Sequence, residues 1–177
     1  SQIITVIDTL APVIQGPIPA DLNLECADDV PPPVNLTAID NCSGAITVSP
    51  TAQITPGACL NDFVMVRTWT FTDTCGNSSS VSQIITVIDT LAPVVQGPIP
   101  TDLNLQCASE VPPLVNLTAF DNCYGEITVS PTAQITPGDN VNDFTMVRTW
   151  TFVDTCGNVS VVNQIITVKD DVAPVIN

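Results

Sequence analysis

Three aspartates beside predicted turns are the residues best suited to chemistry. Asp8 ends one predicted strand, Asp40 follows another, and Asp73 lies in an Asp-Thr-Cys-Gly-Asn turn. In a sandwich fold, the incoming chain, the loop after Asp40 and the Asp73 turn are expected to meet at one pole. The carboxylates, with the amide oxygens of Asn41 and Asn77, would then form a hard oxygen cage suited to calcium. The alternative is that each aspartate caps its own turn through hydrogen bonds to the backbone.

The same acidic set recurs 81 residues later as Asp89, Asp121 and Asp154. Carboxylates that converge repel one another, so a junction built from them would splay without a cation and stiffen with one. The sequence therefore predicts calcium as a cofactor and no other.

Other reaction chemistries lack their parts. The 177 residues include no histidine and no Cys-x-x-Cys pair, which disfavours zinc sites and Ser-His or Cys-His catalysis. Two carboxylates could hydrolyse glycosides, but these acids lie at strand ends of a small sandwich with no room for a cleft. We therefore predict that the chain is not an enzyme and has no catalytic residues.

The charge balance bears on partners and location. Eighteen acidic residues against three basic ones give a net charge of −15, so neither nucleic acid nor an anionic membrane is an expected partner. No apolar run reaches the ~18 residues that a membrane span needs. Seven cysteines are typical of an oxidising exterior, which predicts an extracellular or cell-surface protein.

An internal repeat identifies the elements that must position these residues. Residues 1–81 match residues 82–162 at 65 of 81 positions without a gap, and a third copy starts at Asn163. Within each copy, short alternating runs such as Leu22-Asn-Leu-Glu-Cys26 are typical of half-buried strands, and frequent prolines leave little room for helices. About seven strands per copy predict an all-β fold of two tandem immunoglobulin- or fibronectin-like antiparallel sandwiches.

The repeat also sets the expected boundaries. The chain begins in mid-pattern, which predicts a piece of a longer protein. The expected parts are the last strand of a preceding repeat, two sandwiches and the start of a further linker, at residues 1–8, 9–89, 90–170 and 171–177. Asp8–Pro12 and Asp89–Pro93 are predicted to be stiff connectors, because proline restricts itself and its predecessor to extended conformations.

One strand leaves its orientation open. In Phe63–Phe71, Trp69 shares a face with Arg67, whereas Val64 and Val66 point the other way. The tryptophan face is the expected core face, although it would bring Arg67 inward. That arginine could lie at the rim of the sheet or pair with an acid.

The motifs, taken in order, resemble the hyalin repeat. They are Asp-Thr-Leu-Ala-Pro, Leu-Asn-Leu-Glu-Cys26, Thr-Ala-Ile-Asp40-Asn-Cys42, Arg-Thr-Trp-Thr-Phe-Thr-Asp73-Thr-Cys75-Gly-Asn77 and Gln-Ile-Ile-Thr-Val. The resemblance covers both copies and is closest to the long arrays of bacterial surface adhesins and fibre proteins. It implies immunoglobulin-like modules that serve adhesion or act as spacers.

The cysteines are expected to staple such modules, because the Cys42 loop and the Cys75 turn lie at one pole of an immunoglobulin-like sandwich. The predicted bridges are Cys42–Cys75, Cys123–Cys156 and, as a further option, Cys26–Cys59. A closed loop of about 34 residues would stabilise the fold by roughly 3–4 kcal/mol. Asn140 stands where the first copy has Cys59, which leaves Cys107 single. Cys107 is then either buried and inert or used in an intermolecular bridge.

These observations predict a non-enzymatic structural or adhesive module of a long extracellular surface fibre, a spacer stapled by disulfides and stiffened by calcium. One alternative is a filament subunit in which residues 1–8 add a strand to a neighbouring sheet, and another is an accessory module of a secreted hydrolase. The expected partners are neighbouring repeats, other copies in a fibre, or a surface or matrix ligand. Thr9 and Thr90, each in Asp-Thr-Leu, are candidate O-glycosylation sites.

Overall fold

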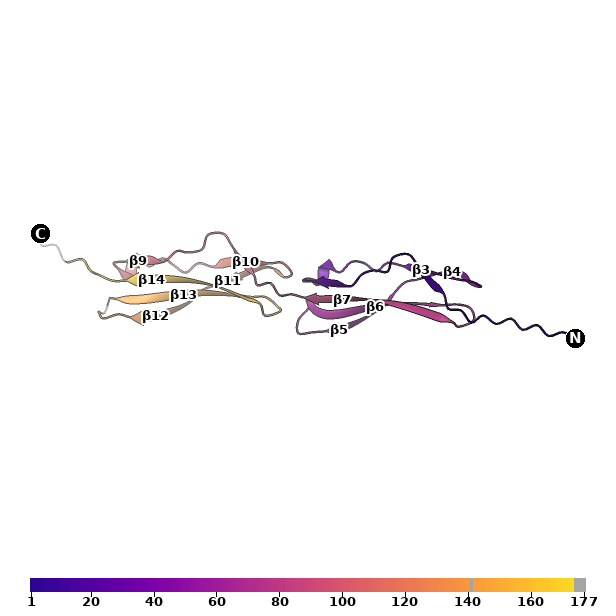
Figure 1. The fold of residues 1–177 in the computed structure, drawn as a ribbon. Coiled ribbons are helices and arrows are strands. Elements are labelled where there is room, and N and C mark those ends of the chain that lie inside the picture. The colour runs from indigo at the N-terminus through magenta and orange to yellow at the C-terminus, as the bar shows by residue number, and fades with distance from the viewer. Residues whose placement is uncertain (141, 174–177) are drawn as a thin grey trace. The chain divides into compact units, whose positions relative to one another are not determined.

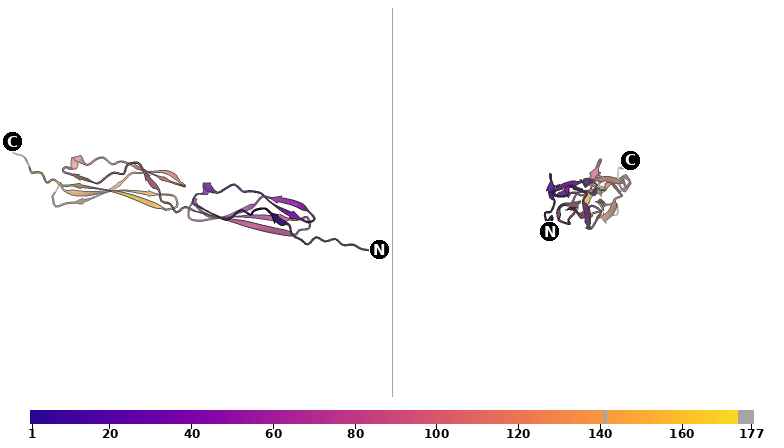
Figure 2. Two further views of the ribbon diagram at one scale, coloured as in Figure 1. Left: turned by 45° about the horizontal axis from the view of Figure 1, so that its top comes forward. Right: turned by 90° about the vertical axis from the view of Figure 1, so that its right-hand side faces the viewer.

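The chain folds into two compact units, Ser1–Asp89 and Thr90–Asn177. The computed structural model describes residues 1–140 and 142–173. In each unit, strands form two layers that face each other, as two different views show (Figures 1 and 2). The predicted all-β fold of two tandem sandwiches is therefore confirmed.

The first unit contains seven strands and one short 3-10 helix among its described residues. They are β1 (Val13–Gln15), β2 (Leu22–Leu24), η1 (Ala27–Asp29), β3 (Leu36–Asp40), β4 (Gly44–Val48), β5 (Thr51–Pro56), β6 (Asp62–Thr72) and β7 (Ser78–Ile88). One sheet has the order β1-β3-β4, and the other has the order β2-β7-β6-β5.

The described part of the second unit repeats this arrangement. Its elements are β8 (Val94–Gln96), β9 (Leu103–Leu105), η2 (Ala108–Glu110), β10 (Leu117–Asp121), β11 (Gly125–Val129), β12 (Thr132–Pro137), β13 (Phe144–Val153) and β14 (Val159–Val168). Its sheets have the orders β8-β10-β11 and β12-β13-β14-β9.

Strand alternation builds the core of the first unit. Leu36 and Ala38 of β3 point inward and meet Trp69 and Phe71 of β6 in one buried cluster. Side chains alternate along a strand, so the residues two positions apart share a face. The tryptophan face of β6 is therefore the core face.

The inward orientation of Arg67 follows from this phase. Its side chain is buried, and Nη2 donates a hydrogen bond to the Pro31 carbonyl at 2.6 Å. Trp69 Nε1 likewise donates to the Val34 carbonyl at 2.9 Å. A buried polar side chain needs a hydrogen-bond partner. The segment between η1 and β3 provides one for Arg67 and one for Trp69 through its backbone carbonyls. The sequence left Arg67 either at the rim of the sheet or paired with an acid. Neither alternative included a hydrogen bond to a backbone carbonyl.

One strand pair in each unit departs from the predicted antiparallel order, β2 with β7 and β9 with β14. β2 runs parallel to β7, with Leu22 opposite Ile85 and Leu24 opposite Val87. The chain leaves the other sheet after β1 and turns at Gly16, whose φ of +81° favours glycine. It then joins the second sheet at β2, so one short segment contributes a strand to each layer.

Residues 1–8 carry no regular secondary structure, and the side chains of Ile3 and Val6 are each 89% exposed. Their assignment to a preceding repeat remains a prediction. Of the predicted linker at 171–177, residues 174–177 lie outside the described residues.

Candidate functional site

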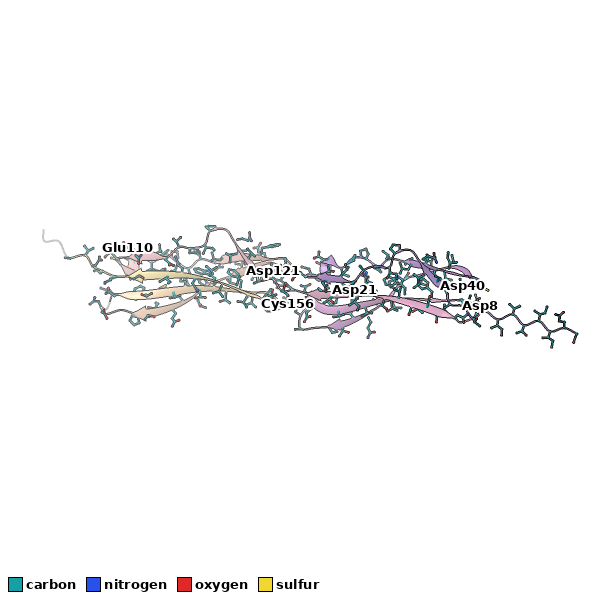
Figure 3. All side chains as sticks on the ribbon, in the orientation of Figure 1. Asp8, Asp21, Asp40, Glu110, Asp121 and Cys156 are labelled. Atoms are coloured by element: carbon teal, nitrogen blue, oxygen red, sulfur yellow. The ribbon has the colours of Figure 1, made fainter. Side chains whose placement is uncertain are left out.

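The three aspartates of the first unit lie together. One carboxylate oxygen each from Asp8, Asp40 and Asp73 is within 4.8 Å of the other two. Asp8 belongs to the incoming segment, Asp40 ends β3, and Asp73 follows β6. Figure 3 shows Asp8 and Asp40 at the end of this unit from which the N-terminal segment leaves.

Asp40 reaches the site because β3 alternates. Leu36, Ala38 and Asp40 all face inward, and the Asp40 side chain is only 3% exposed. Its Oδ1 accepts hydrogen bonds from the N–H groups of Cys42, at 3.0 Å, and Ser43, at 2.6 Å. Its Oδ2 is buried and has no hydrogen-bond partner among the described residues.

Asp73 organises the turn between β6 and β7. Its Oδ1 accepts hydrogen bonds from the N–H groups of Cys75 and Asn77, each at 2.8 Å, and its Oδ2 accepts one from Asn77 Nδ2 at 2.7 Å. Although desolvation opposes ionisation, these hydrogen bonds hold the pKa of Asp73 below its ordinary value. Gly76, with φ of +92°, permits the tight turn.

Asp8 is tied to the same turn by Asn77. The Asn77 Nδ2 donates to the Asp8 carbonyl at 3.1 Å as well as to Asp73. The Asp8 Oδ1 accepts the Leu10 N–H at 3.2 Å, and its Oδ2 is buried without a hydrogen-bond partner in the described chain. The Asn77 side chain therefore lies beside the acids, and its nitrogen makes both of these contacts.

Asn41 is also placed differently from the expectation. Its Nδ2 donates to the Cys42 sulfur at 3.1 Å. Asp40 has the predicted capping role through one oxygen, and its other oxygen makes no hydrogen bond among the described residues, so the two predicted roles are compatible in this residue. From the sequence these roles were alternatives, because residue spacing does not show that the two oxygens of one carboxylate can have different partners.

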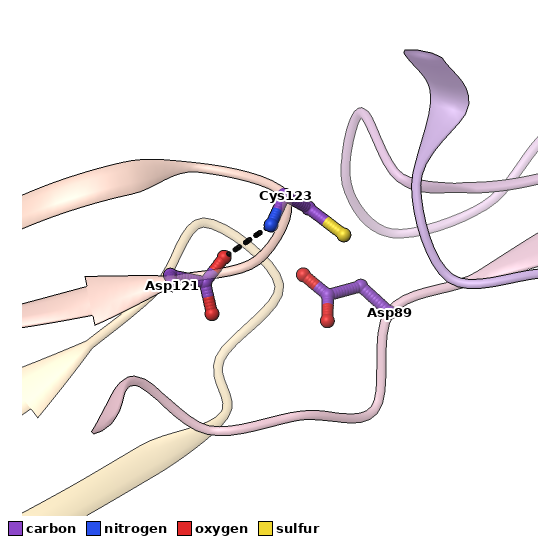
Figure 4. A group of neighbouring side chains, drawn as sticks. All are labelled: Asp89, Asp121 and Cys123. Carbon is purple, nitrogen blue, oxygen red and sulfur yellow. Dashed lines mark hydrogen bonds between the residues drawn. The ribbon is translucent and has the colours of Figure 1, made fainter. Parts of the chain in front are cut away.

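The second unit repeats the capping pattern. Asp121 Oδ1 accepts hydrogen bonds from the N–H groups of Cys123, at 3.0 Å (Figure 4), and Tyr124, at 2.8 Å. Asp121 is 1% exposed, and its Oδ2 is buried without a hydrogen-bond partner among the described residues. Asp121 therefore resembles Asp40 in both respects.

Asp154 matches Asp73, and its carboxylate accepts two N–H groups and the Asn158 side chain. Desolvation opposes ionisation there, but these hydrogen bonds lower the pKa of Asp154. Asp89 ends the first unit and donates its N–H to the Asn61 carbonyl at 3.0 Å. Calcium at either set of aspartates remains a prediction.

One of the three predicted cysteine pairs differs from the expectation. Cys26 and Cys59 are disulfide-bonded in the first unit, and Cys123 and Cys156 are disulfide-bonded in the second. Cys42 and Cys75 are free, so the predicted Cys42–Cys75 bridge is wrong for this structure. Desolvation, a hydrogen bond to Asp8 and the charges of Asp8 and Asp40 raise the pKa of Cys42, which keeps its thiol protonated and less reactive.

Cys107 is free and exposed, which corrects the expectation that it is buried. Its N–H donates to Glu110 Oε2 at 3.2 Å at the start of η2. Its first-unit counterpart, Cys26, is 8% exposed. Because Asn140 replaces the partner cysteine, Cys107 has no disulfide to the described residues of the loop before β13. The candidate glycosylation sites Thr9 and Thr90 are both exposed.

A shallow apolar hollow recurs on the two units. No charged side chain lines the hollow in either unit. The lining residues are Leu10, Ala11, Val13, Gln15, Ile39 and Asn41 in the first unit, and Leu91, Ala92, Val94, Gln96, Phe120 and Asn122 in the second. Such surfaces can contact a ligand but hold no acid or base.

Comparisons with known proteins agree with the repeat. Residues 14–87 and 95–168 each match the family described as "HYR-like domain with 4 cysteines". The chain is 33% identical over 185 residues to hyalin of Lytechinus variegatus, an alignment that covers 97% of this chain. The chain spans about a third of that relative, 34% of its length. Among the described residues, no helix has the length and apolar character needed to cross a bilayer.

Proposed function

The chain belongs to the hyalin-repeat family as two HYR-like domains, and on that premise we propose that it is a non-enzymatic adhesive spacer of an extracellular fibre. The observation that carries this proposal is the path of the chain through the first unit. The Asp8 carbonyl accepts a hydrogen bond from the side chain of Asn77, which lies just before β7. Strand β7 is eleven residues long and ends at Ile88. Each unit therefore advances the chain by about 35 Å, the length of such a strand.

The points where the chain enters are held firmly. Asn77 Nδ2 binds the Asp8 carbonyl, and Ser79 Oγ donates to the Pro12 carbonyl at 2.6 Å. The β6–β7 ladder, from Asp62 opposite Ile88 to Thr72 opposite Ser78, runs the length of the unit. These contacts support a role in which the module transmits tension without unravelling.

An extracellular location is supported by the disulfide-bonded cysteines of both units, since disulfides persist in oxidising surroundings. Adhesion is supported by the family and by the uncharged apolar hollow that each unit presents. Neighbouring repeats and a surface or matrix ligand are the proposed partners, and calcium at the aspartates would stiffen the spacer.

Small-angle X-ray scattering on chains with one, two and four copies tests the spacer role. The maximum dimension should grow by about the same increment for each added copy, because every copy advances the chain by one strand length. A dimension that levels off after two copies would show that the copies fold back and would refute the spacer.

A filament subunit is the second candidate, favoured by the exposed N-terminal segment. Residues 1–8 have the same sequence as 82–89, most of which is strand β7, and their apolar side chains are exposed. Such a strand could add to the sheet of another copy. If so, deletion of residues 1–7 should abolish concentration-dependent assembly in sedimentation velocity, and equal sedimentation of both chains would remove this candidate.

A further inference from the structure

We propose that Asp8, Asp40 and Asp73 bind one calcium ion in the first unit. One oxygen from each carboxylate lies within 4.8 Å of the others. Calcium holds its oxygen ligands at about 2.3–2.6 Å, so ligands on opposite sides of the ion lie roughly 5 Å apart. Three oxygens with this mutual spacing can share one ion while the turns that carry them keep their hydrogen bonds.

A buried oxygen without a partner points to the ligand independently of the acidic cluster. The Asp40 side chain is 97% buried, its Oδ1 is used by two N–H groups, and its Oδ2 has no hydrogen-bond partner in the described chain. Burial of a carboxylate oxygen without compensation is unfavourable. A cation beside Oδ2 supplies the missing interaction.

The charge of the cluster also requires a cation. Residues 1–89 contain a single lysine or arginine, Arg67, and its guanidinium is committed to the Pro31 carbonyl. Three converging carboxylates therefore have no basic side chain to balance them. An ion from solution can supply the balancing charge, and it would relieve a strong repulsion, because like charges lie a few ångströms apart in a partly buried site.

The donor set favours calcium among the divalent cations. The carboxylate oxygens are hard ligands, and the chain contains no histidine, the usual ligand of transition metals. Calcium accepts six to eight oxygens in flexible geometry, whereas magnesium demands a near-ideal octahedron. Water would complete the coordination around three protein oxygens.

The ion would join three segments that are distant in sequence. Asp8 lies in the incoming chain, Asp40 ends β3 and Asp73 opens the β6–β7 turn. Bound calcium would therefore fix the incoming segment to the sandwich. This consequence rests on the proposed spacer function, whereas the ion site itself does not.

A calcium titration of the ¹⁵N-labelled 177-residue protein, followed by NMR, tests the site. The amide signals of Cys42, Ser43 and Asn77 should shift, because these N–H groups bind the ligand carboxylates. A dissociation constant of about 10⁻⁴–10⁻³ M is expected, as for other extracellular calcium modules.

Two variants and one control locate the ion. Asp40→Asn keeps an oxygen for the two turn N–H groups and should weaken binding at least about tenfold, since ligand charge sets calcium affinity. Asp8→Asn, outside every strand, should do the same if Asp40→Asn fails to fold. Asp21→Asn is the matched control: Asp21 Oδ1 accepts the Ile84 N–H at 2.7 Å at the other end of the unit, so binding should be unchanged.

The inference is overturned if these amides do not shift up to about 10 mM calcium, well above the expected dissociation constant. It is also overturned if Asp40→Asn and Asp8→Asn both titrate like the unchanged protein, or if magnesium produces the same shifts at equal concentration. Any of these results leaves the scattering test of the spacer untouched, so the two proposals fail separately.

Discussion

Two of the capping aspartates, one in each unit, use only one of their two carboxylate oxygens in the turn that they cap. In Asp40 and Asp121, Oδ1 fixes the following turn, while the buried Oδ2 makes no hydrogen bond in the described part of the chain. Asp73 and Asp154 instead use both oxygens within their turns. Asp40 and Asp121 therefore anchor their turns with one oxygen and keep the other without a hydrogen bond among the described residues.

Acid should destabilise the second unit through Asp154. Its carboxyl has a folded pKa below the unfolded value of about 3.9, so the stability it contributes is present above that value and is lost as the pH falls through the folded pKa. In urea unfolding with chelator from pH 7 to 2, stability should drop below about pH 4. Asp154→Asn should make that drop shallower, and an unchanged pH dependence would contradict the assignment.

Replacement of Arg148 tests a buried cation whose hydrogen-bond partners are backbone carbonyls and a side-chain amide. Arg148 donates to the carbonyls of Pro112 and Pro113 and to Gln164 Oε1. Arg148→Met should lower the free energy of unfolding by about 2–3 kcal/mol, because these carbonyls lose a charged donor. Thr151→Val on the exposed face of the same strand is the control. Equal urea midpoints for the two variants would show that the hydrogen bonds contribute nothing.

At the scale of elements, the alternating patterns and turn residues were sufficient to predict the strands. Alternation in Leu22–Cys26, for example, predicted the half-buried strand that the structure has as β2. The phase of β6 stayed open because Arg67 shares the tryptophan face, and its partner, the Pro31 carbonyl, lies 36 residues away in the sequence. Backbone acceptors carry no signal in the side-chain pattern, so this contact could not be read from the sequence.

One of the predicted cysteine pairs, Cys42–Cys75, differs from the prediction. The repeat makes Cys42 and Cys75 equivalent to Cys123 and Cys156, yet the first pair is free and the second is bonded. Only the fold brings Asp8 to the Cys42 thiol. The positions of the acids in the sequence predicted correctly that the three carboxylates of the first unit lie together. They did not predict how the charges of these acids affect the nearby Cys42 thiol.

A second-unit bridge can be restored by one substitution. Asn140 occupies the position of Cys59, which is disulfide-bonded in the first unit, and Cys107 is free and exposed. Asn140→Cys should bond to Cys107 and raise the stability of this unit by about 3–4 kcal/mol, through closure of a loop of about 34 residues.

Urea unfolding with and without reductant measures the effect of that bridge, and a thiol count should fall by one relative to the starting chain. Asn140→Ser is the control, because it also removes the Asn140–Asp143 hydrogen bond without adding a thiol. A thiol count that rises by one would show that the two loops of the second unit are too far apart to bond.

At the scale of the whole molecule, charge and repetition dominate. A net charge of −15 on 177 residues opposes compaction through self-repulsion. We expect the melting temperature to rise when sodium chloride increases from about 10 mM to 150 mM, because the Debye length shrinks from about 30 Å to 8 Å. Differential scanning calorimetry in chelator would detect this, and a melting temperature independent of salt would contradict it.

The path of the chain through a unit has a genetic consequence. Because the segment around Asp8 and the end of β7 lie at opposite ends of one sandwich, a copy carries both of its own connection points. Recombination that inserts or removes one 81-residue copy leaves the folding information of its neighbours intact. A lineage could thus lengthen or shorten its fibre by unequal crossing-over while the chemistry presented by every copy stays the same.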